Sequence, residues 1–570
     1  MPPGRTQTTH APCHGATSNW LNLRHPTSGR RAWLLRYLLI GLCGAITSLA
    51  QPPFFLTAAI FVTLPPLVWA LDGGYDKAAG RRVLRAGLIG WWFGFGYFVS
   101  GLYWIGFALL VEADKFAHFI PLAVIALPAG LALFTGLAFA LASVFWRPNQ
   151  PARLLLLATS WFLLEWLRGH ILTGFPWHSI GYIWTGDSLL HGAVAQGAAL
   201  FGVYGLGFLT LLLAGLPALL SGGQWRRPTG GALITVIPLS ALLLIGWGAW
   251  RAQQIADDSL ASDSLASNSP EIPLRIVQPN IAQQEKWIPG NRVAHFEKLL
   301  QLSQRPAATR PQIIIWPEAA TPFFLAEQPE ALRLIGQLLP QDGLLITGSP
   351  RLSVRSAETA AGDTSGTPVH NSILFIDSSG QIQASYDKFH LVPFGEYLPF
   401  RSLLSAIGLR KLTNDIGAFA PGPGPQTVRL SNLPAVSPLI CYEIIFPGAV
   451  TDQAQRPGWI VNLTNDAWFG DTSGPPQHLA QTRMRAIEEG IPVIRAANNG
   501  ISAVISPSGI VLQALPLNQT GIIETMLPKP VTRPPYAQYQ DMPLLLLSFL
   551  VLIFFTILRI REKHFPNMHA

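Results

Sequence analysis

The spacing of its apolar runs is the feature that most constrains how this sequence can fold. Seven runs lie before residue 251 and one lies after residue 540, and between them is a long segment of ordinary polarity. The runs cover Tyr37–Ala50, Phe54–Leu71, Leu84–Val111, Phe119–Trp146, Leu154–Leu167, Val194–Leu220, Ala232–Trp250 and Pro543–Leu558. Most approach the roughly 20 helical residues that cross the apolar core of a bilayer. Because a backbone inside lipid must satisfy its own hydrogen bonds, the runs predict about eight membrane-spanning helices.

The charge content supports a membrane protein and argues against a nucleic-acid-binding protein. Only 12% of the residues are charged, whereas soluble domains usually contain about 25%. The net charge of +8 fits the excess of Lys and Arg that polytopic proteins carry in their cytoplasmic loops. No basic face with interleaved aromatic residues is visible, so we expect no nucleic-acid partner.

The basic loops predict the orientation of the chain. Arg-rich segments precede the first run and follow the second, fourth, sixth and eighth runs, so that eight spans place all of them on one side. By the positive-inside rule that side is the cytoplasm, and both termini lie there. The predicted parts are a disordered cytoplasmic tail (1–32), seven spans (33–251), a linker (252–271), an extracytoplasmic domain (272–535), a final span (536–560) and a cytoplasmic tail (561–570).

The end of the fifth run carries charges that are unusual in a membrane segment. Glu165 and Arg168 are three residues apart, which suits either an ion pair at a helix end or a contact with a lipid headgroup or substrate. The turn-rich loop 173–178 that follows could anchor at the interface or form part of a lipid entrance.

The segment between the last two runs has the pattern of an α/β domain. Its strand-like runs are Leu274–Gln278, Ile313–Trp316, Leu344–Thr347, Ser372–Ile376, Leu439–Tyr442, Trp459–Leu463, Val493–Ala496 and Ala503–Ser506. Amphipathic helices are predicted over Val293–Leu302, Pro329–Leu339 and Gln477–Glu489. Short strands that alternate with helices are typical of α/β architecture.

Three residues in this domain have the chemistry of acyl transfer through a thioester. Glu318 and Cys441 each follow an apolar strand, and Lys388 follows a hairpin-like turn. A thiol nucleophile needs a base and, where the oxyanion forms, positive charge or N–H donors. We expect Cys441 to be the nucleophile, Glu318 the base and Lys388 the cation, which would also lower the pKa of the thiol.

Each of these residues also has a structural interpretation. A single buried Cys is often a core residue, Glu318 could serve a helix N-terminus, and Lys388 could be a solvated turn residue. The remaining cysteines, Cys13 and Cys43, suggest no disulfide framework, and the sequence requires no metal and no organic cofactor.

The contexts of these three residues, in this order, resemble the nitrilase or carbon–nitrogen hydrolase superfamily. Within it, the membrane frame resembles the apolipoprotein N-acyltransferase family, from the first span to the last. The matching stretches are Val277–Gln283 with Trp287, Trp316–Glu318, Tyr386–Lys388 with Pro393–Pro399, Cys441–Glu443, Asn462–Phe469 and Arg495–Gly500, and in the membrane part Glu165–Arg168 with Gly174–Trp177.

The resemblance implies an αββα sandwich and a role for each site residue. Glu318, Lys388 and Cys441 would form the catalytic triad. Glu396 would support the lysine and the thiol. The residues that would shape or contact the substrate are Trp287, Asn371, Tyr442 and Glu443, although Asn371 could equally be a strand-start residue. The backbone N–H of Tyr442 would complete an oxyanion hole.

The resemblance also implies the reaction and the partners. A phospholipid of the bacterial inner membrane, typically phosphatidylethanolamine, would donate its sn-1 acyl chain to Cys441. The α-amine of a diacylglyceryl-cysteine at the N-terminus of an apolipoprotein would then take the acyl group in a ping-pong reaction, the last step of lipoprotein maturation.

Two other interpretations remain open from the residues. A membrane-tethered amidase or nitrilase would use the same triad and release its thioester to water. A transporter or scaffold with an inactive domain is disfavoured by the intact triad and by the scarcity of ionisable residues in the spans.

Overall fold

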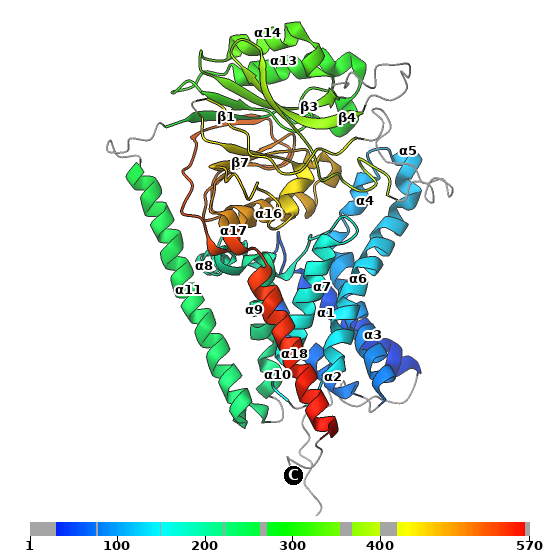
Figure 1. Cartoon of the computed structure of the whole chain (residues 1–570). Helices are drawn as coiled ribbons and strands as arrows, with labels where there is room; N and C mark the ends of the chain where they lie inside the picture. The colour runs from blue at the N-terminus through cyan, green and yellow to red at the C-terminus, as the bar shows by residue number, and fades with distance from the viewer. Residues whose placement is uncertain are drawn as a thin grey trace, which may run out of the picture.

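The computed structural model describes residues 30–75, 78–148, 150–220, 223–262, 271–353, 368–399, 419–431 and 433–564. It consists of a bundle of helices and, at one end of the bundle, a two-sheet α/β sandwich (Figure 1). The expected tail at 1–32 lies outside these residues except for its last part, because the first helix begins at Arg30. Residues 565–570 of the expected C-terminal tail also lie outside them.

Each of the eight apolar runs contributes a helix to the bundle. These helices are α1 (Arg30–Ser48), α2 (Ala58–Gly73), α3 (Ala79–Leu102), α6 (Ile120–Val144), α7 (Arg153–His170), α9 (Ala198–Gly215), α11 (Pro228–Ser262) and α18 (Met542–His564). The shorter helices α4 (Ile105–Ala108), α5 (Ala113–Phe116), α8 (Leu189–Ala195), α10 (Pro217–Leu220) and α17 (Pro535–Tyr539) lie between or beside them.

Four helical stretches in the described residues are both long and apolar enough to cross a bilayer. They are Ala113–Val144, Ala198–Leu220, Pro228–Asp258 and Met542–Arg561, and two shorter apolar helical stretches are Trp33–Ser48 and Ala58–Gly73. Large apolar side chains on α11 and α18 are exposed, among them Leu243 and Leu550. Exposed apolar surface of this extent marks a surface that meets lipid or a partner. The chain is therefore a membrane protein, whereas a total of eight spans stays a prediction.

The predicted linker at 252–271 is partly wrong. Helix α11 continues to Ser262, and residues 263–270 lie outside the described part of the chain. Residues 251–262 contain no Pro or Gly, so nothing in this segment interrupts the hydrogen-bonding pattern of the helix.

The sandwich consists of two sheets. The strands are β1 (Pro273–Gln278), β2 (Ile313–Ile315), β3 (Leu344–Leu352), β4 (Val369–Asp377), β5 (Ile382–Asp387), β6 (Val436–Ile440), β7 (Trp459–Thr464), β8 (Val493–Ala497), β9 (Ser502–Ile505), β10 (Val511–Leu515) and β11 (Gly521–Met526). One sheet has the order β11-β1-β2-β3-β4-β5, and the other has the order β10-β9-β8-β7-β6. Strands β1–β2–β3 are parallel, as are β6–β7–β8. The predicted α/β domain is therefore confirmed.

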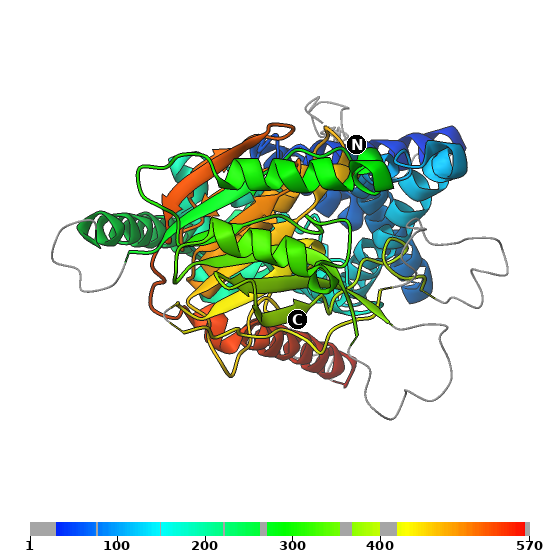
Figure 2. The same ribbon diagram turned by 90° about the horizontal axis from the view of Figure 1, so that it is seen from above.

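Helices cover both outer faces of the sandwich, which gives α-β-β-α layers. The inner core joins side chains of both sheets, such as Ile276 and Phe375 from one and Ile440 and Val461 from the other. The outer core of the first sheet contains residues of α13 (Arg292–Ser303) and α14 (Pro329–Leu338), which lie across that sheet when it is seen from above (Figure 2).

Helix α16 (Gly474–Glu489) covers the second sheet and faces the membrane helices (Figure 1). Its buried side chains Met484 and Ile487 belong to the same hydrophobic cluster as residues of α1, α3, α7 and α9. The core of the sandwich is therefore continuous with the core of the bundle on this side, and α16 is the element that joins the two.

Candidate active site

Cys441 lies at a sharp turn between a strand and a 3-10 helix. Strand β6 ends at Ile440, and η8 spans Cys441–Ile445. Cys441 has a φ of 51°, a left-handed conformation that is uncommon for a residue with a side chain and that marks many functional turns. The prediction that the strand extends to Tyr442 is wrong, because the Ile440 N–H donates to Glu443 Oε2 over 2.7 Å and closes the turn.

A cluster of buried polar groups surrounds the Lys388 ammonium. Lys388 Nζ lies 2.9 Å from Glu396 Oε1 and 3.8 Å from Glu318 Oε1. The Asn371 side-chain amide, on β4, donates to Glu318 Oε1 over 2.8 Å and to Glu396 Oε1 over 3.1 Å. Asn371 therefore bridges the two carboxylates that flank the lysine, and the structure brings together all four of these predicted site residues.

Burial governs the ionisation of this cluster. It raises the pKa of Glu318, although Lys388 acts in the opposite direction. Burial lowers the pKa of Lys388, but Glu396 and Glu318 outweigh burial and hold that pKa above its usual range, so the lysine stays charged. A charged lysine between two carboxylates is a fixed positive centre in a region of low dielectric.

The Cys441 thiol is protonated in the resting site. Burial and then the Glu318 charge raise its pKa to about 12, while Lys388 and a hydrogen bond with Thr464 lower it by less. Lys388 lowers the pKa of the thiol, as expected from the sequence. The effects of burial and of Glu318 are larger, however, so the pKa of the thiol is raised overall. A thiol of this kind must lose its proton to a base as it attacks.

Glu443 connects the Cys441 turn to the segment that carries Lys388. Its Oε1 accepts from Tyr386 Oη over 2.8 Å, from the Phe389 N–H over 2.9 Å and from the His390 N–H over 3.2 Å. Burial raises the pKa of Glu443 to about 7, against these donors. The geometry gives Glu443 a positioning part in the site.

Trp287, one of the residues expected to contact the substrate, is half-buried and follows the last residue of α12 (Gln283–Lys286). Its neighbour Lys286, which the sequence analysis missed, is the residue that reaches Glu318. Lys286 Nζ donates to the Glu318 carbonyl oxygen over 3.0 Å, and burial lowers the pKa of this lysine to about 8. The only sequence signal was its proximity to Trp287.

A second buried network contacts the backbone of the nucleophile. Two of its members, Asp466 and Arg495, lie in stretches that carry the family resemblance, but the sequence analysis gave none of its members a role. His478 Nε2, on α16, lies 3.2 Å from the Cys441 carbonyl oxygen, and its Nδ1 lies 2.9 Å from Asp466 Oδ1. Arg495 Nη2 donates to Asp466 Oδ2 over 2.7 Å. The network holds the Cys441 peptide in place through its carbonyl group, with the Tyr442 N–H at the start of η8.

The donor atoms of Cys441, Asp466 and His478 lie within 4.8 Å of one another, a spacing that could suit a metal ion. The Arg495 guanidinium already neutralises Asp466 and lies 3.1 Å from His478 Nδ1. A cation here would meet that positive charge, so we assign the cluster to hydrogen bonding.

The loop after α7 links the membrane helices to the site. Arg168 Nη1 donates to the carbonyl oxygens of Phe175 and Trp177 over 2.5 and 2.7 Å. The Arg168 guanidinium also lies 3.6 Å from Glu165. Glu165 and Arg168 are both buried, so the two form an internal ion pair.

The same loop touches two residues beside the nucleophile. His390 Nε2 lies 2.6 Å from the Thr173 carbonyl oxygen, and Tyr442 Oη donates to the Gly174 carbonyl oxygen over 3.2 Å. The loop that Arg168 shapes therefore forms part of the surroundings of Cys441.

The sequence matches two family models. Residues 43–216 match the apolipoprotein N-acyltransferase N-terminal domain, and residues 274–534 match the carbon-nitrogen hydrolase family. Among solved structures, Saccharomyces cerevisiae Nit3, a member of branch 10 of the nitrilase superfamily, is 15% identical, with a TM-score of 0.33 over 46% of this chain and 91% of that chain.

Curated relatives match almost the whole chain. The apolipoprotein N-acyltransferase of Rhodopseudomonas palustris is 43% identical over 92% of this chain and 95% of its own length. The enzymes of the same name from Brucella suis and Bradyrhizobium diazoefficiens are 43% and 42% identical, over 87% and 93% of this chain and 90% and 96% of their own lengths. The resemblance inferred from the motifs is confirmed: the chain belongs to the apolipoprotein N-acyltransferase family.

Proposed function

We propose that this protein N-acylates the N-terminal diacylglyceryl-cysteine of apolipoproteins, with a phospholipid as acyl donor. Family membership supports the acyltransferase activity and the lipoprotein substrate. The single observation that carries the chemistry is the buried thiol of Cys441, on which the charges of Glu318 and Lys388 both act. Phosphatidylethanolamine is the donor that we propose.

The first half-reaction transfers the acyl group to the enzyme. As the Cys441 sulfur attacks the sn-1 ester carbonyl carbon, Glu318 takes the thiol proton, and the Lys388 ammonium and the Tyr442 N–H stabilise the oxyanion. The ester C–O bond then breaks, Glu318 returns the proton to the leaving oxygen, and a lysophospholipid departs. The thioester remains on Cys441.

The second half-reaction transfers the acyl group to the acceptor. The α-amine of the lipoprotein's N-terminal cysteine attacks the thioester carbonyl carbon, and Glu318 takes a proton from the amine. The C–S bond then breaks, and Glu318 returns this proton to the Cys441 sulfur, which regenerates the thiol and the carboxylate. Since one site serves both substrates in turn, we propose ping-pong kinetics. Glu396 and Asn371 hold Lys388 and Glu318, while Trp287 and Tyr442 shape the pocket for the substrates.

We propose that the helices cross the bacterial inner membrane eight times, with the sandwich on the extracytoplasmic side. The basic ends of several helices gather at the end of the bundle opposite the sandwich (Figure 1). Contacts at this end include Arg36 with the Ala70 carbonyl at 2.8 Å, Arg153 with Asp72 at 3.1 Å and Arg559 with the Val144 carbonyl at 2.8 Å. This clustering supports a cytoplasmic location for that end and for both termini.

The intact mass of the purified protein tests the reaction. After incubation with phosphatidylethanolamine alone, we expect a gain of one fatty acyl group that hydroxylamine removes. The matched control is Cys441→Ala, which should gain nothing. Adding a diacylated lipopeptide should then discharge the acyl group onto the peptide amine.

Two results would contradict this function. An acyl adduct that persists in Cys441→Ala would remove the thiol from the mechanism. The absence of any adduct, together with release of ammonia from small amides, would indicate the membrane-tethered amidase.

A further inference from the structure

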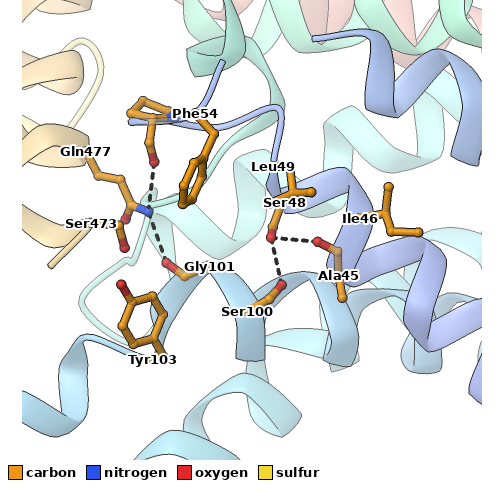
Figure 3. A pocket seen from close by; sticks show the side chains of 11 residues that line it. Ala45, Ile46, Ser48, Leu49, Phe54, Ser100, Gly101, Tyr103, Ser473 and Gln477 are labelled. Atoms are coloured by element: carbon orange, nitrogen blue, oxygen red, sulfur yellow. Dashed lines mark hydrogen bonds between the residues drawn. The ribbon is translucent and has the colours of Figure 1, made fainter. Parts of the chain in front are cut away.

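A pocket of about 360 Å³ lies where the bundle meets the sandwich. It lies at the last turns of α1 and α3 and at the first turn of α16, and none of the proposed catalytic residues lines it. Its volume is in the range of about 300–1,000 Å³ that is typical of sites for small ligands. Figure 3 shows Ser473 and Gln477 on one wall, with Ile46, Ser48 and Leu49 across from them.

The mouth of this pocket belongs to the apolar surface of the bundle. Ile46, Leu49, Phe54 and Tyr103 line it, and all four are exposed. Further apolar side chains of α1, among them Leu42, are exposed on the same helix. Since α1 contains a short apolar helical stretch in a membrane protein, we infer that this mouth opens to the bilayer. An aromatic residue with a polar tip, such as Tyr103, suits the interface.

One buried polar side chain of the pocket lining lacks a partner among the described residues. The Ser473 hydroxyl makes no hydrogen bond with any described residue, although only 5% of Ser473 is exposed. A buried hydroxyl without a partner is costly, so such a group is expected to meet a ligand or a water molecule.

The other buried polar side chains of the pocket lining already have hydrogen-bond partners. Gln477 Oε1 accepts from the Trp104 and Trp177 indoles over 3.0 and 2.8 Å, and its Nε2 donates to the Gly101 carbonyl over 3.1 Å. The Ser48 and Ser100 hydroxyls bond to each other over 2.7 Å. Among the buried side chains of the lining, Ser473 therefore offers the free hydrogen-bond donor, whereas the Tyr103 hydroxyl belongs to an exposed residue of the mouth.

We propose that this pocket binds a bilayer phospholipid, with an acyl chain against Ile46, Leu49 and Phe54 and an ester carbonyl oxygen accepting from Ser473. This is a lipid site separate from the one at which Cys441 reacts. Its position between α1, α3 and α16 lets the bound lipid fill the joint between the bundle and the sandwich. The proposal rests on the membrane location of the chain and is independent of the acyl transfer reaction.

Photocrosslinking tests this site. The full-length protein with Cys441→Ala, which cannot form a thioester, is placed in nanodiscs that contain phosphatidylethanolamine with a diazirine in its acyl chain. After irradiation we expect lipid adducts, identified by peptide mass spectrometry, on segments 45–54 and 100–103.

Ile46→Trp, which fills the pocket, should lower these adducts several-fold. The matched control Leu39→Trp lies about two turns earlier on α1, is also at an exposed position and does not line the pocket, so its adducts should stay at the starting level. Ser473→Ala should lower them by removing only the hydroxyl group. Thermal unfolding of each variant in the same nanodiscs establishes that it is folded.

Several results would overturn the proposal. Equal adducts in Ile46→Trp and Leu39→Trp would show ordinary contact with surrounding lipid. Loss of the phospholipid adducts when an excess of diacylated lipopeptide is added would assign the pocket to the acceptor. The intact-mass assay on the wild-type protein reports separately on the acyl transfer reaction, so failure of one proposal leaves the other testable.

Discussion

The Cys441 thiol and the Glu318 carboxylate are both buried, so each holds its proton more strongly than it would in water. The Glu318 charge adds to the raised pKa of the thiol, which reaches about 12. Because the thiolate is the reactive form of cysteine, a thiol that stays protonated between turnovers is protected from oxidation and alkylation. The same carboxylate that suppresses the thiolate at rest is the base that we propose to remove the proton during attack.

Glu318→Gln separates these two effects. Loss of the negative charge should lower the pKa of the thiol, so that iodoacetamide alkylates Cys441 faster than in the wild-type protein at any pH below about 12. Loss of the base should lower the acylation rate by about 10²–10⁴-fold. Both rates are measured by mass spectrometry in a Cys13→Ser, Cys43→Ser background. Slower alkylation, or acylation at the wild-type rate, would contradict the assigned role.

His478 offers a test of how the nucleophile is positioned. His478→Ala should lower kcat by about 10- to 100-fold with little change in the KM for phospholipid, because the Cys441 peptide would lose the group that holds its carbonyl. His478→Gln, whose amide can still donate to that carbonyl, should recover part of the rate. If both variants lose activity equally and also unfold at a lower temperature, the residue has only a structural part.

At the scale of elements, α16 and the loop 171–180 bring membrane and catalytic groups together. Helix α16 carries Gln477, which bonds to Trp104 and Trp177 of the bundle, and next to it His478, which contacts the Cys441 carbonyl. Arg168 donates a hydrogen bond to a backbone carbonyl of this loop, and the Tyr442 hydroxyl donates one to another. The position of the nucleophile therefore depends on elements from both parts of the chain.

Arg168→Ala should damage both stability and activity. Without the guanidinium, the buried Glu165 carboxylate loses its ion-pair partner and two carbonyl groups lose a hydrogen-bond donor. Breaking a buried ion pair lowers the free energy of unfolding by about 3–5 kcal/mol. Arg168→Lys should recover little, since an ammonium lacks the fork that spans several acceptors. Thermal unfolding and acylation are measured in the same detergent.

The matched control is Arg333→Ala, which removes an exposed ion pair with Glu330 on α14. We expect no measurable change in either assay. Equal stability of the two variants would refute an organising part for Arg168.

At the scale of the whole molecule, the bundle and the sandwich share one hydrophobic cluster, so neither is closed without the other. The basic helix ends lie at one end of the bundle and the sandwich lies at the other (Figure 1). This arrangement would bring the proposed thioester chemistry to the membrane surface, where lipid substrates are available and the reacting groups are kept from water.

The proposed orientation predicts which positions a reagent can reach from the extracytoplasmic side of the membrane. Leu189 is 95% exposed at the start of α8, near the sandwich. Gln150 is also exposed, and it lies just before the first residue of α7, Arg153. In spheroplasts of the Cys13→Ser, Cys43→Ser protein, a membrane-impermeant maleimide should label Leu189→Cys. Gln150→Cys should react only after the membrane is permeabilised. The reverse pattern would invert the topology.

The residue pattern alone identifies the class of the molecule and the elements that carry its proposed chemistry. Runs of apolar residues fix helices in lipid because the backbone has no other hydrogen-bond partner there. Alternating short strands and helices fix an α/β domain. Glu318 and Cys441 stand where apolar strands end, a position that local pattern reveals. Strands β5, β10 and β11 were missed because several of their residues are exposed and lack a continuous apolar run.

The environment of the thiol and the identity of its supporting residues depend on how the whole chain packs. Lys286, Asp466, His478 and Arg495 are polar residues whose partners lie far away in the sequence, so local pattern gives no sign that they are buried together. The pKa of Cys441 is raised, whereas the sequence led us to expect a lowered value. The attraction between the thiolate and Lys388 can be inferred from the sequence, but the desolvation of the thiol depends on the residues that pack around it. Periodicity specifies local structure, and the dielectric environment of a reacting atom is set by everything that folds around it.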